Sequence, residues 1–214
     1  MIGGRLAWLL LLWACLSPLV AIGQQLDAMS LDRWKLLRET ERYQLQIAEK
    51  YYRDKNFKVA ADEYEKYLSL YERSDAAPYA QLKWSLCQVA LRRSNTAIKE
   101  GFQSVVDYWP DSDDAVAAAY YIGSTYQGMG RIPDAKRAYR AALENHGKHL
   151  VAAYSAKGLV DIAIIEKDDK TILAMNRHLT FKVQRNKSNR AICQSASQQL
   201  AVHFFREAAF VEAV

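Results

Sequence analysis

Small residues recur along the chain at a nearly constant interval, and this repeat constrains the fold more than any other feature of the sequence. Ala48, Ser85 and Gly123 stand 37 and then 38 residues apart. A second set with the same two intervals consists of Ala60, Ala97 and Ala135. A period of this length is typical of helical hairpins that bury their apolar faces only when neighbouring hairpins stack on them. The spacing therefore predicts a solenoid.

The residues between these positions favour helices. Apolar residues recur at three- and four-residue spacing, while the two-residue alternation of strands is scarce. Ser30, and either Asp111 or Ser112, can cap helices, and Gly130 followed by Pro133 marks a helix end and a helix start. We expect an all-α, right-handed solenoid of antiparallel hairpins, with helices at 31–52, 58–71, 79–91, 95–108, 115–129, 133–145, 152–166, 171–181 and 191–214.

Three hairpins, at about 41–74, 78–111 and 116–149, resemble the tetratricopeptide repeat family. That family alternates small and aromatic residues on two helices joined by a glycine turn. Gln88 and Gly101 depart from the pattern in the second repeat, Asn56 stands near the glycine turn of the first, and 150–214 holds only degenerate repeats and a last helix. The residues that carry the resemblance are Ala48, Tyr51, Ala60, Tyr64, Ala97, Gly123, Tyr126, Gly130, Ala135, Tyr139 and Ala142.

The resemblance implies a non-catalytic module that binds a protein or peptide in the concave groove formed by its first helices. Tyrosines offer such a ligand contact area at low entropic cost, although in a helical array they also serve as packing. The groove residues that the resemblance implies are Arg42, Leu45, Glu49, Tyr52, Arg53, Tyr79, Ala117, Tyr120, Ser124 and Gln127.

The first 23 residues have the features of a secretory signal peptide. Arg5 precedes an apolar run from Leu6 to Val20, and Ala21 and Gly23 provide the small residues of a cleavage site after Gly23. An uncleaved membrane anchor and a lipoprotein modified at Cys15 are the alternatives. We expect an exported protein of the periplasm or cell envelope, and the extra residues between its repeats are similar to those of bacterial envelope proteins.

Removal of that segment leaves Cys87 and Cys193, more than a hundred residues apart. A disulfide needs Cα atoms within about 7 Å, which distant sites of an elongated array do not provide. We expect two buried free thiols.

Positive charge gathers in the second half of the chain. From Arg131 to Arg190 there are 13 Lys and Arg residues against 6 Asp and Glu residues. Such a surface can engage anionic envelope polymers, lipid headgroups or an acidic partner segment, or it can be an ordinary solvated loop. Nucleic acid is not an expected partner of an exported protein. The basic patch consists of Lys182, Arg185, Lys187 and Arg190.

The sequence gives little support for catalysis, a cofactor or a metal. His146 and His149 lie close to Glu144, but a third ligand at standard spacing is missing. No phosphate-binding glycine loop and no nucleophile–base set can be argued from spacing. We therefore expect a protein-interaction scaffold of the bacterial envelope. The alternatives are an envelope-assembly subunit that uses its basic half, and a regulatory or truncated part of a larger enzyme complex.

Overall fold

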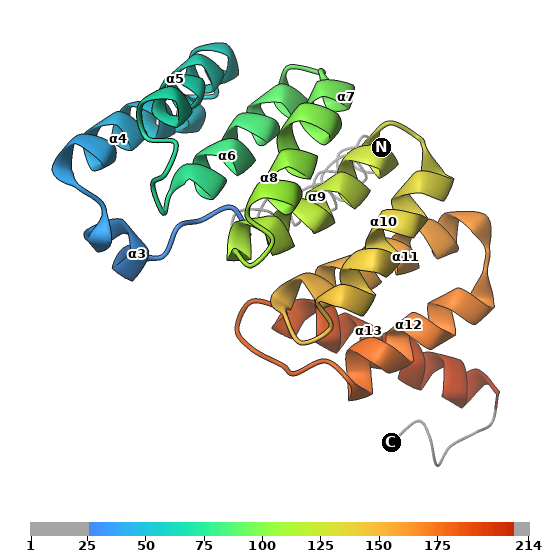
Figure 1. The fold of residues 1–214 in the computed structure, drawn as a ribbon. Helices are drawn as coiled ribbons and strands as arrows, with labels where there is room; N and C mark the ends of the chain where they lie inside the picture. Colours follow the sequence, from blue (N-terminus) through green and yellow to red (C-terminus); the bar gives the residue numbers. More distant parts are fainter. Residues whose placement is uncertain (1–25, 208–214) are drawn as a thin grey trace, which may run out of the picture.

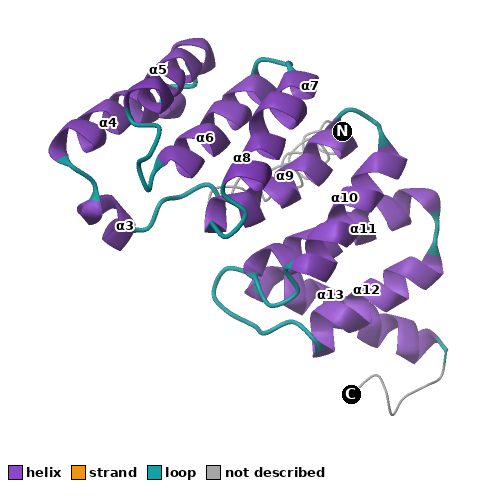
Figure 2. Cartoon of the chain, in the orientation of Figure 1, coloured by secondary structure: helices purple, strands orange, loops and turns teal. Residues whose placement is uncertain are grey.

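The computed structural model describes residues 26–207 as a stack of helical hairpins. The expected signal peptide at 1–23 and the end of the expected last helix, 208–214, lie outside the described residues. Throughout the described part of the chain, the regular elements are helices joined by loops (Figure 2). The expectation of an all-α solenoid is confirmed. None of the helices between residues 26 and 207 is long and apolar enough to span a bilayer.

Two sets of helices alternate along the stack (Figure 1). Consecutive helices pack in antiparallel hairpins, and first helices of neighbouring hairpins also touch, as α6 touches α9 and α9 touches α11. The first helices are α4 (Glu39–Arg53), α6 (Ala77–Ala90), α9 (Asp113–Gly128), α11 (Leu150–Glu166) and α13 (Arg190–Arg206). The second helices are α5 (Phe57–Leu70), the run of α7 (Ser94–Thr96), η1 (Ala97–Phe102) and α8 (Gln103–Tyr108), then α10 (Ile132–Asn145) and α12 (Asp169–Phe181).

The single helix expected at 31–52 is wrong, because the chain is interrupted before α4. A short helix, α3 (Leu31–Leu36), is capped by Ser30 and ends at Leu37, which is extended and buried. A new helix then starts, since the carboxylate of Glu41 accepts the backbone N–H of Arg38 at 2.8 Å. The backbone N–H groups at the start of a helix have no partner within the helix, and this contact satisfies one of them.

Left-handed residues in the turns mark four repeats within residues 26–207. Lys55, Arg92, Gly130 and Lys167 have positive φ angles of 58, 62, 73 and 58 degrees, and they follow one another at intervals of 37, 38 and 37 residues. Each lies between the two helices of a hairpin. The left-handed residue of the first repeat is therefore Lys55, directly before Asn56, and α11 with α12 forms the fourth repeat.

The second repeat departs from the family pattern because its second helix contains a π-helical segment, η1. Gly101 lies so close to α6 that a Cβ there would stand 2.2 Å from the Oγ of Ser85. A π-helical turn contains one residue more than an α-helical turn, and this shift turns Phe102 into the core. Phe102 is fully buried there, and its ring stacks on that of Tyr121 with the two centroids 5.7 Å apart. Phe102 thus supplies the aromatic ring that Gly101 lacks.

The alternation of small and large residues is a packing device in the third repeat. The ring of Tyr139 lies between Gly123 of α9 and Gly158 of α11, and a Cβ on either glycine would approach that ring to 2.6 Å. Most of the residues that carry the resemblance are buried, whereas Tyr51 and Tyr126 are half-buried and Gly130 is exposed in its turn. Cys87 and Cys193 are free and buried, as expected. The fully or nearly buried members are Ala48, Ala60, Tyr64, Ala97, Gly123, Ala135, Tyr139 and Ala142.

Candidate functional site

The structure does not bring the expected groove residues together in one groove. Arg42 lines a pocket of about 650 Å³ at the first end of the stack, together with Trp34 and Tyr71. Arg53 is exposed at the end of α4. Leu45 and Ala117 are buried in the core and cannot contact a ligand on an open surface. The remaining residues fall into a polar cluster in the first two repeats and a pocket in the last two.

The pocket between the third and fourth repeats contains three of the expected groove residues. Tyr120, Ser124 and Gln127 of α9 line a cavity of about 450 Å³. Lys157 and Asp161 of α11 line its opposite side. Pockets that hold ligands usually measure roughly 300–1,000 Å³, so this volume suits a few side chains of a partner segment.

Aromatic rings and fixed polar groups form this pocket. The Tyr120 ring centroid lies 5.8 Å from those of Tyr139 and Tyr154, and burial raises the pKa of Tyr120 to about 12. The Tyr139 hydroxyl donates to the Oε1 of Gln127 at 2.8 Å, which fixes the amide. Lys157 and Asp161 form an ion pair at 2.5 Å. The pocket therefore offers apolar ring faces, an oriented amide and a balanced charge pair.

Lys157, Asp161 and Tyr154 were missed from the sequence, although the repeat contains a signal for them. The turns at Gly130 and Lys167 lie 37 residues apart, and this interval carries Tyr120 onto Lys157 and Ser124 onto Asp161. The fourth repeat lacks the small and aromatic residues of the family pattern. It could therefore not be aligned with the third repeat until its left-handed turn residue was known.

The polar cluster in the first two repeats is centred on Glu49 and Lys83. Glu49 accepts hydrogen bonds from the hydroxyls of Tyr64 at 2.6 Å and Tyr79 at 2.7 Å. Burial and the Glu49 carboxylate raise the pKa of both tyrosines well above the usual value. The Lys83 ammonium lies 3.8 Å from Glu49 and 3.5 Å above the Tyr52 ring centroid.

This cluster corrects the place of Tyr79, which is only 4% exposed and belongs to the core. Glu49 and Tyr52 remain half-buried, but the Glu49 carboxylate is hydrogen-bonded and one face of the Tyr52 ring is covered by Lys83. Nothing in the sequence indicated that Lys83 is buried, since a lysine on a helix is normally solvated. Only its neighbours in space explain why its side chain is 4% exposed.

The expected basic patch covers the loop between α12 and α13 together with Arg190, the first residue of α13, and we call residues 182–190 the basic loop. Its four basic residues are exposed. The loop is ordered from within by Asn189, which is buried and donates to the Gln184 carbonyl at 2.9 Å. Tyr154 also donates to the Ser188 carbonyl at 3.3 Å, which ties the loop to α11.

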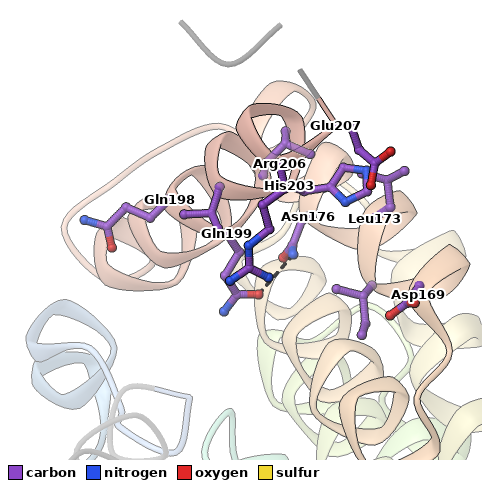
Figure 3. Close-up of a pocket in the computed structure, with 11 residues that line it drawn as sticks. Asp169, Leu173, Asn176, Gln198, Gln199, His203, Arg206 and Glu207 are labelled. Atoms are coloured by element: carbon purple, nitrogen blue, oxygen red, sulfur yellow. Dashed lines mark hydrogen bonds between the residues drawn. The ribbon is translucent and has the colours of Figure 1, made fainter. Parts of the chain in front are cut away.

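Residues of α12 and α13, which pack on each other, line a further pocket of about 560 Å³ (Figure 3). Its walls carry Asp169 and Leu173 on one helix and His203 and Arg206 on the other, and Asn176 donates to Gln199 at 3.0 Å. None of the residues expected from the sequence lies here. The pocket ends at Glu207, the last residue that the structure describes.

The histidines of the expected loop have structural contacts. His149 caps α11, because its Nδ1 accepts the backbone N–H of Val151 at 3.2 Å. Burial, together with His149, lowers the pKa of His146. Among residues 26–207, no group of three or more His, Cys, Asp or Glu side chains is arranged to hold a metal ion.

Comparison with known proteins agrees with this geometry. Residues 117–149, which form the hairpin of α9 and α10, match the family model described as tetratricopeptide repeat. No curated protein matches the chain. Repeats of this family are in general non-catalytic modules that bind protein partners. The matched hairpin is stacked on three others with the same turn geometry, and this supports the assignment of this hairpin as a tetratricopeptide repeat.

Proposed function

We propose that this protein is an exported, non-catalytic scaffold of the bacterial cell envelope that binds an extended or helical segment of a partner protein. The binding site is the pocket between the third and fourth repeats, formed by Tyr120, Ser124, Gln127, Lys157 and Asp161.

The observation that carries this proposal is the composition of that pocket. It is the place where three groove residues implied by the family coincide with a cavity large enough for a ligand. Tyrosine side chains supply large contact area at low conformational cost, and a fixed amide can bond the backbone of an extended peptide. A partner side chain that is apolar or aromatic would stack on Tyr120, while Lys157 and Asp161 would bond polar groups beside it.

Site-specific photocrosslinking in cells tests the binding surface. A photoreactive residue in place of Ser124 is expected to capture a partner protein in high yield. The matched control replaces Ala141, which is exposed on α10 of the same repeat and lines no part of the pocket. Tyr120→Ala and Gln127→Ala are expected to abolish the Ser124 crosslink. Equal crosslinking from Ser124 and Ala141 would contradict the assignment.

Export is supported by the N-terminal sequence, with its single positive charge, its apolar run and the small residues Ala21 and Gly23. Amino-terminal sequencing of the mature protein from a cell-envelope fraction is expected to begin at Gln24. Recovery of the intact chain from the cytosolic fraction would refute the export step and leave the proposal for the pocket unaffected.

A second candidate function uses the basic loop to contact an anionic lipid or polymer surface. The observation that favours it is an ordered loop with four exposed cations. Binding to vesicles that contain anionic phospholipid should weaken as salt is raised, and should be lost when the four cations are changed to glutamine. The control removes an equal charge elsewhere, at the exposed residues Lys50, Arg53, Lys58 and Lys66. Equal losses in both variants would exclude a specific role for the loop.

A further inference from the structure

The chain segment before α3 lies against the first helices of the second and third repeats. In Figure 1 it runs from α3 towards α8 and α9. Leu26 is only 9% exposed and belongs to the same apolar cluster as Leu82 of α6 and Ala117 of α9. A leucine at the start of the described chain is thus buried between repeats. We call residues 26–36 the strap.

Asp27 of the strap supplies the carboxylate that pairs with Lys83. The two charged groups are 3.1 Å apart, and their side chains are 10% and 4% exposed. Lys83 also lies above the Tyr52 ring and near Glu49. A buried ammonium is stable only with such partners, and removal of one member of a buried pair is strongly unfavourable. The site therefore selects a segment that brings a negative charge.

Arg33 forms the second anchor of the strap. Its guanidinium pairs with Asp114 of α9 at 2.6 Å and donates to the carbonyl of Asp75, before α6, at 2.6 Å. Between and beyond these anchors the contacts are fewer: Met29 and Trp34 are half-buried against the core of the first repeat, α3 has no buried residue, and Leu31 and Leu36 are 66% and 78% exposed. A segment with so few buried side chains can detach while the repeats remain folded.

We propose that the strap is a built-in ligand of a second binding site, formed by Tyr52, Leu82 and Lys83, and that this site recognises a leucine followed by an acidic residue. While the strap is bound, an external segment cannot enter. When the strap detaches, a segment with the same apolar–acidic pattern takes its place. This site is distinct from the pocket of the third and fourth repeats, so the inference does not depend on the function proposed for that pocket.

The sequence contains its own control for this proposal. Leu31 and Asp32 repeat the residue pair of Leu26 and Asp27, but they are exposed on α3. The test compares the full chain with two variants, Leu26→Ala/Asp27→Ala and Leu31→Ala/Asp32→Ala. Acetylation of Lys83 by an N-hydroxysuccinimide ester, followed by mass spectrometry, should be at least tenfold faster in the first variant only. Exposed Lys58 is the internal reference.

Binding is then measured with a fluorescent peptide that has the sequence of the strap, residues 26–36. It should bind the Leu26→Ala/Asp27→Ala chain at least tenfold more tightly than the wild-type chain or the Leu31→Ala/Asp32→Ala chain. A further Lys83→Met change, or Asp27→Asn in the peptide, should remove this binding.

Several outcomes would overturn the proposal. One is equal affinity of the peptide for all three chains, and another is no binding to the Leu26→Ala/Asp27→Ala chain while its circular dichroism remains native. Should that double variant unfold, Asp27→Asn is used instead, because it keeps the size of the side chain. Lys83 acetylation as slow in Asp27→Asn as in the wild-type chain would then show that the strap does not control access to the site.

Discussion

A methyl group added at Gly158 is expected to destabilise the protein, because the ring of Tyr139 has no space to move away. An alanine Cβ at this position would stand 2.6 Å from both Cε2 and Cζ of Tyr139, whereas ordinary contacts are 3.4–4 Å. The opposite edge of the ring lies against Gly123, where a Cβ would also stand at 2.6 Å. The hydroxyl is held by Gln127. Relief of the overlap therefore requires α11 to shift relative to α10.

The size of the effect follows from two opposing contributions. Overpacking of a filled core costs about 1–3 kcal/mol, and the upper end applies here because the ring is confined on both edges. Alanine is favoured over glycine inside a helix by about 1 kcal/mol, which offsets part of that cost. We expect Gly158→Ala to lower the free energy of unfolding by about 2 kcal/mol, which corresponds to a decrease in Tm of about 4–8 °C for a chain of this size.

Urea denaturation followed by circular dichroism measures this difference, with Gly128→Ala as the matched control. Gly128 is exposed at the end of α9, and a Cβ there would meet nothing within 4 Å. The control should be as stable as the wild-type chain or up to about 1 kcal/mol more stable. If Gly158→Ala proves as stable as Gly128→Ala, the argument that glycine is required for the close approach of these helices is refuted.

Two further predictions concern titratable groups. The hydrogen bond from Arg38 holds the pKa of Glu41 below its ordinary value of 4.5, so the folded chain favours the ionised carboxylate. That stabilisation is present above pH 4.5 and is lost as the pH falls through the folded pKa; the advantage of the wild-type chain over Glu41→Gln in urea denaturation should therefore shrink below pH 4.5. Burial raises the pKa of Cys87 to about 12. At pH 8 iodoacetamide should label Cys87 only as fast as the chain unfolds, and rapid labelling of the folded chain would contradict its burial.

Much of the fold was predictable from the sequence because local signals and the repeat agree. Capping residues such as Ser30 and Ser112, and the turn at Gly130, act within a few residues of where they stand. The interval of 37 or 38 residues arises because each hairpin must present the same close-packing positions to the next one. These signals were sufficient for the helix type, the hairpin order and three repeats, and Cys87 and Cys193 are buried as expected.

The functional sites were less predictable, because they depend on which side chains meet across repeats. The implied groove set included Tyr79, which is buried, and omitted Lys157 and Asp161, which line the pocket. The register of the fourth repeat, which contains Lys157 and Asp161, follows from the left-handed turn at Lys167. Lysine seldom adopts this conformation, so the sequence did not indicate the turn.

The sequence by itself determined most of the helices and the hairpin period. Caps and turns act between residues close together in the chain, and the period repeats the same packing positions in each hairpin. Only the tertiary structure decided that Asp27 pairs with Lys83, 56 residues away, and that Arg33 pairs with Asp114. The energy of such ion pairs depends on burial, and burial is a property of the assembled stack. Lys83 has the sequence pattern of a solvated helix residue, and it is buried because Asp27, Glu49 and the Tyr52 ring meet it in the assembled stack.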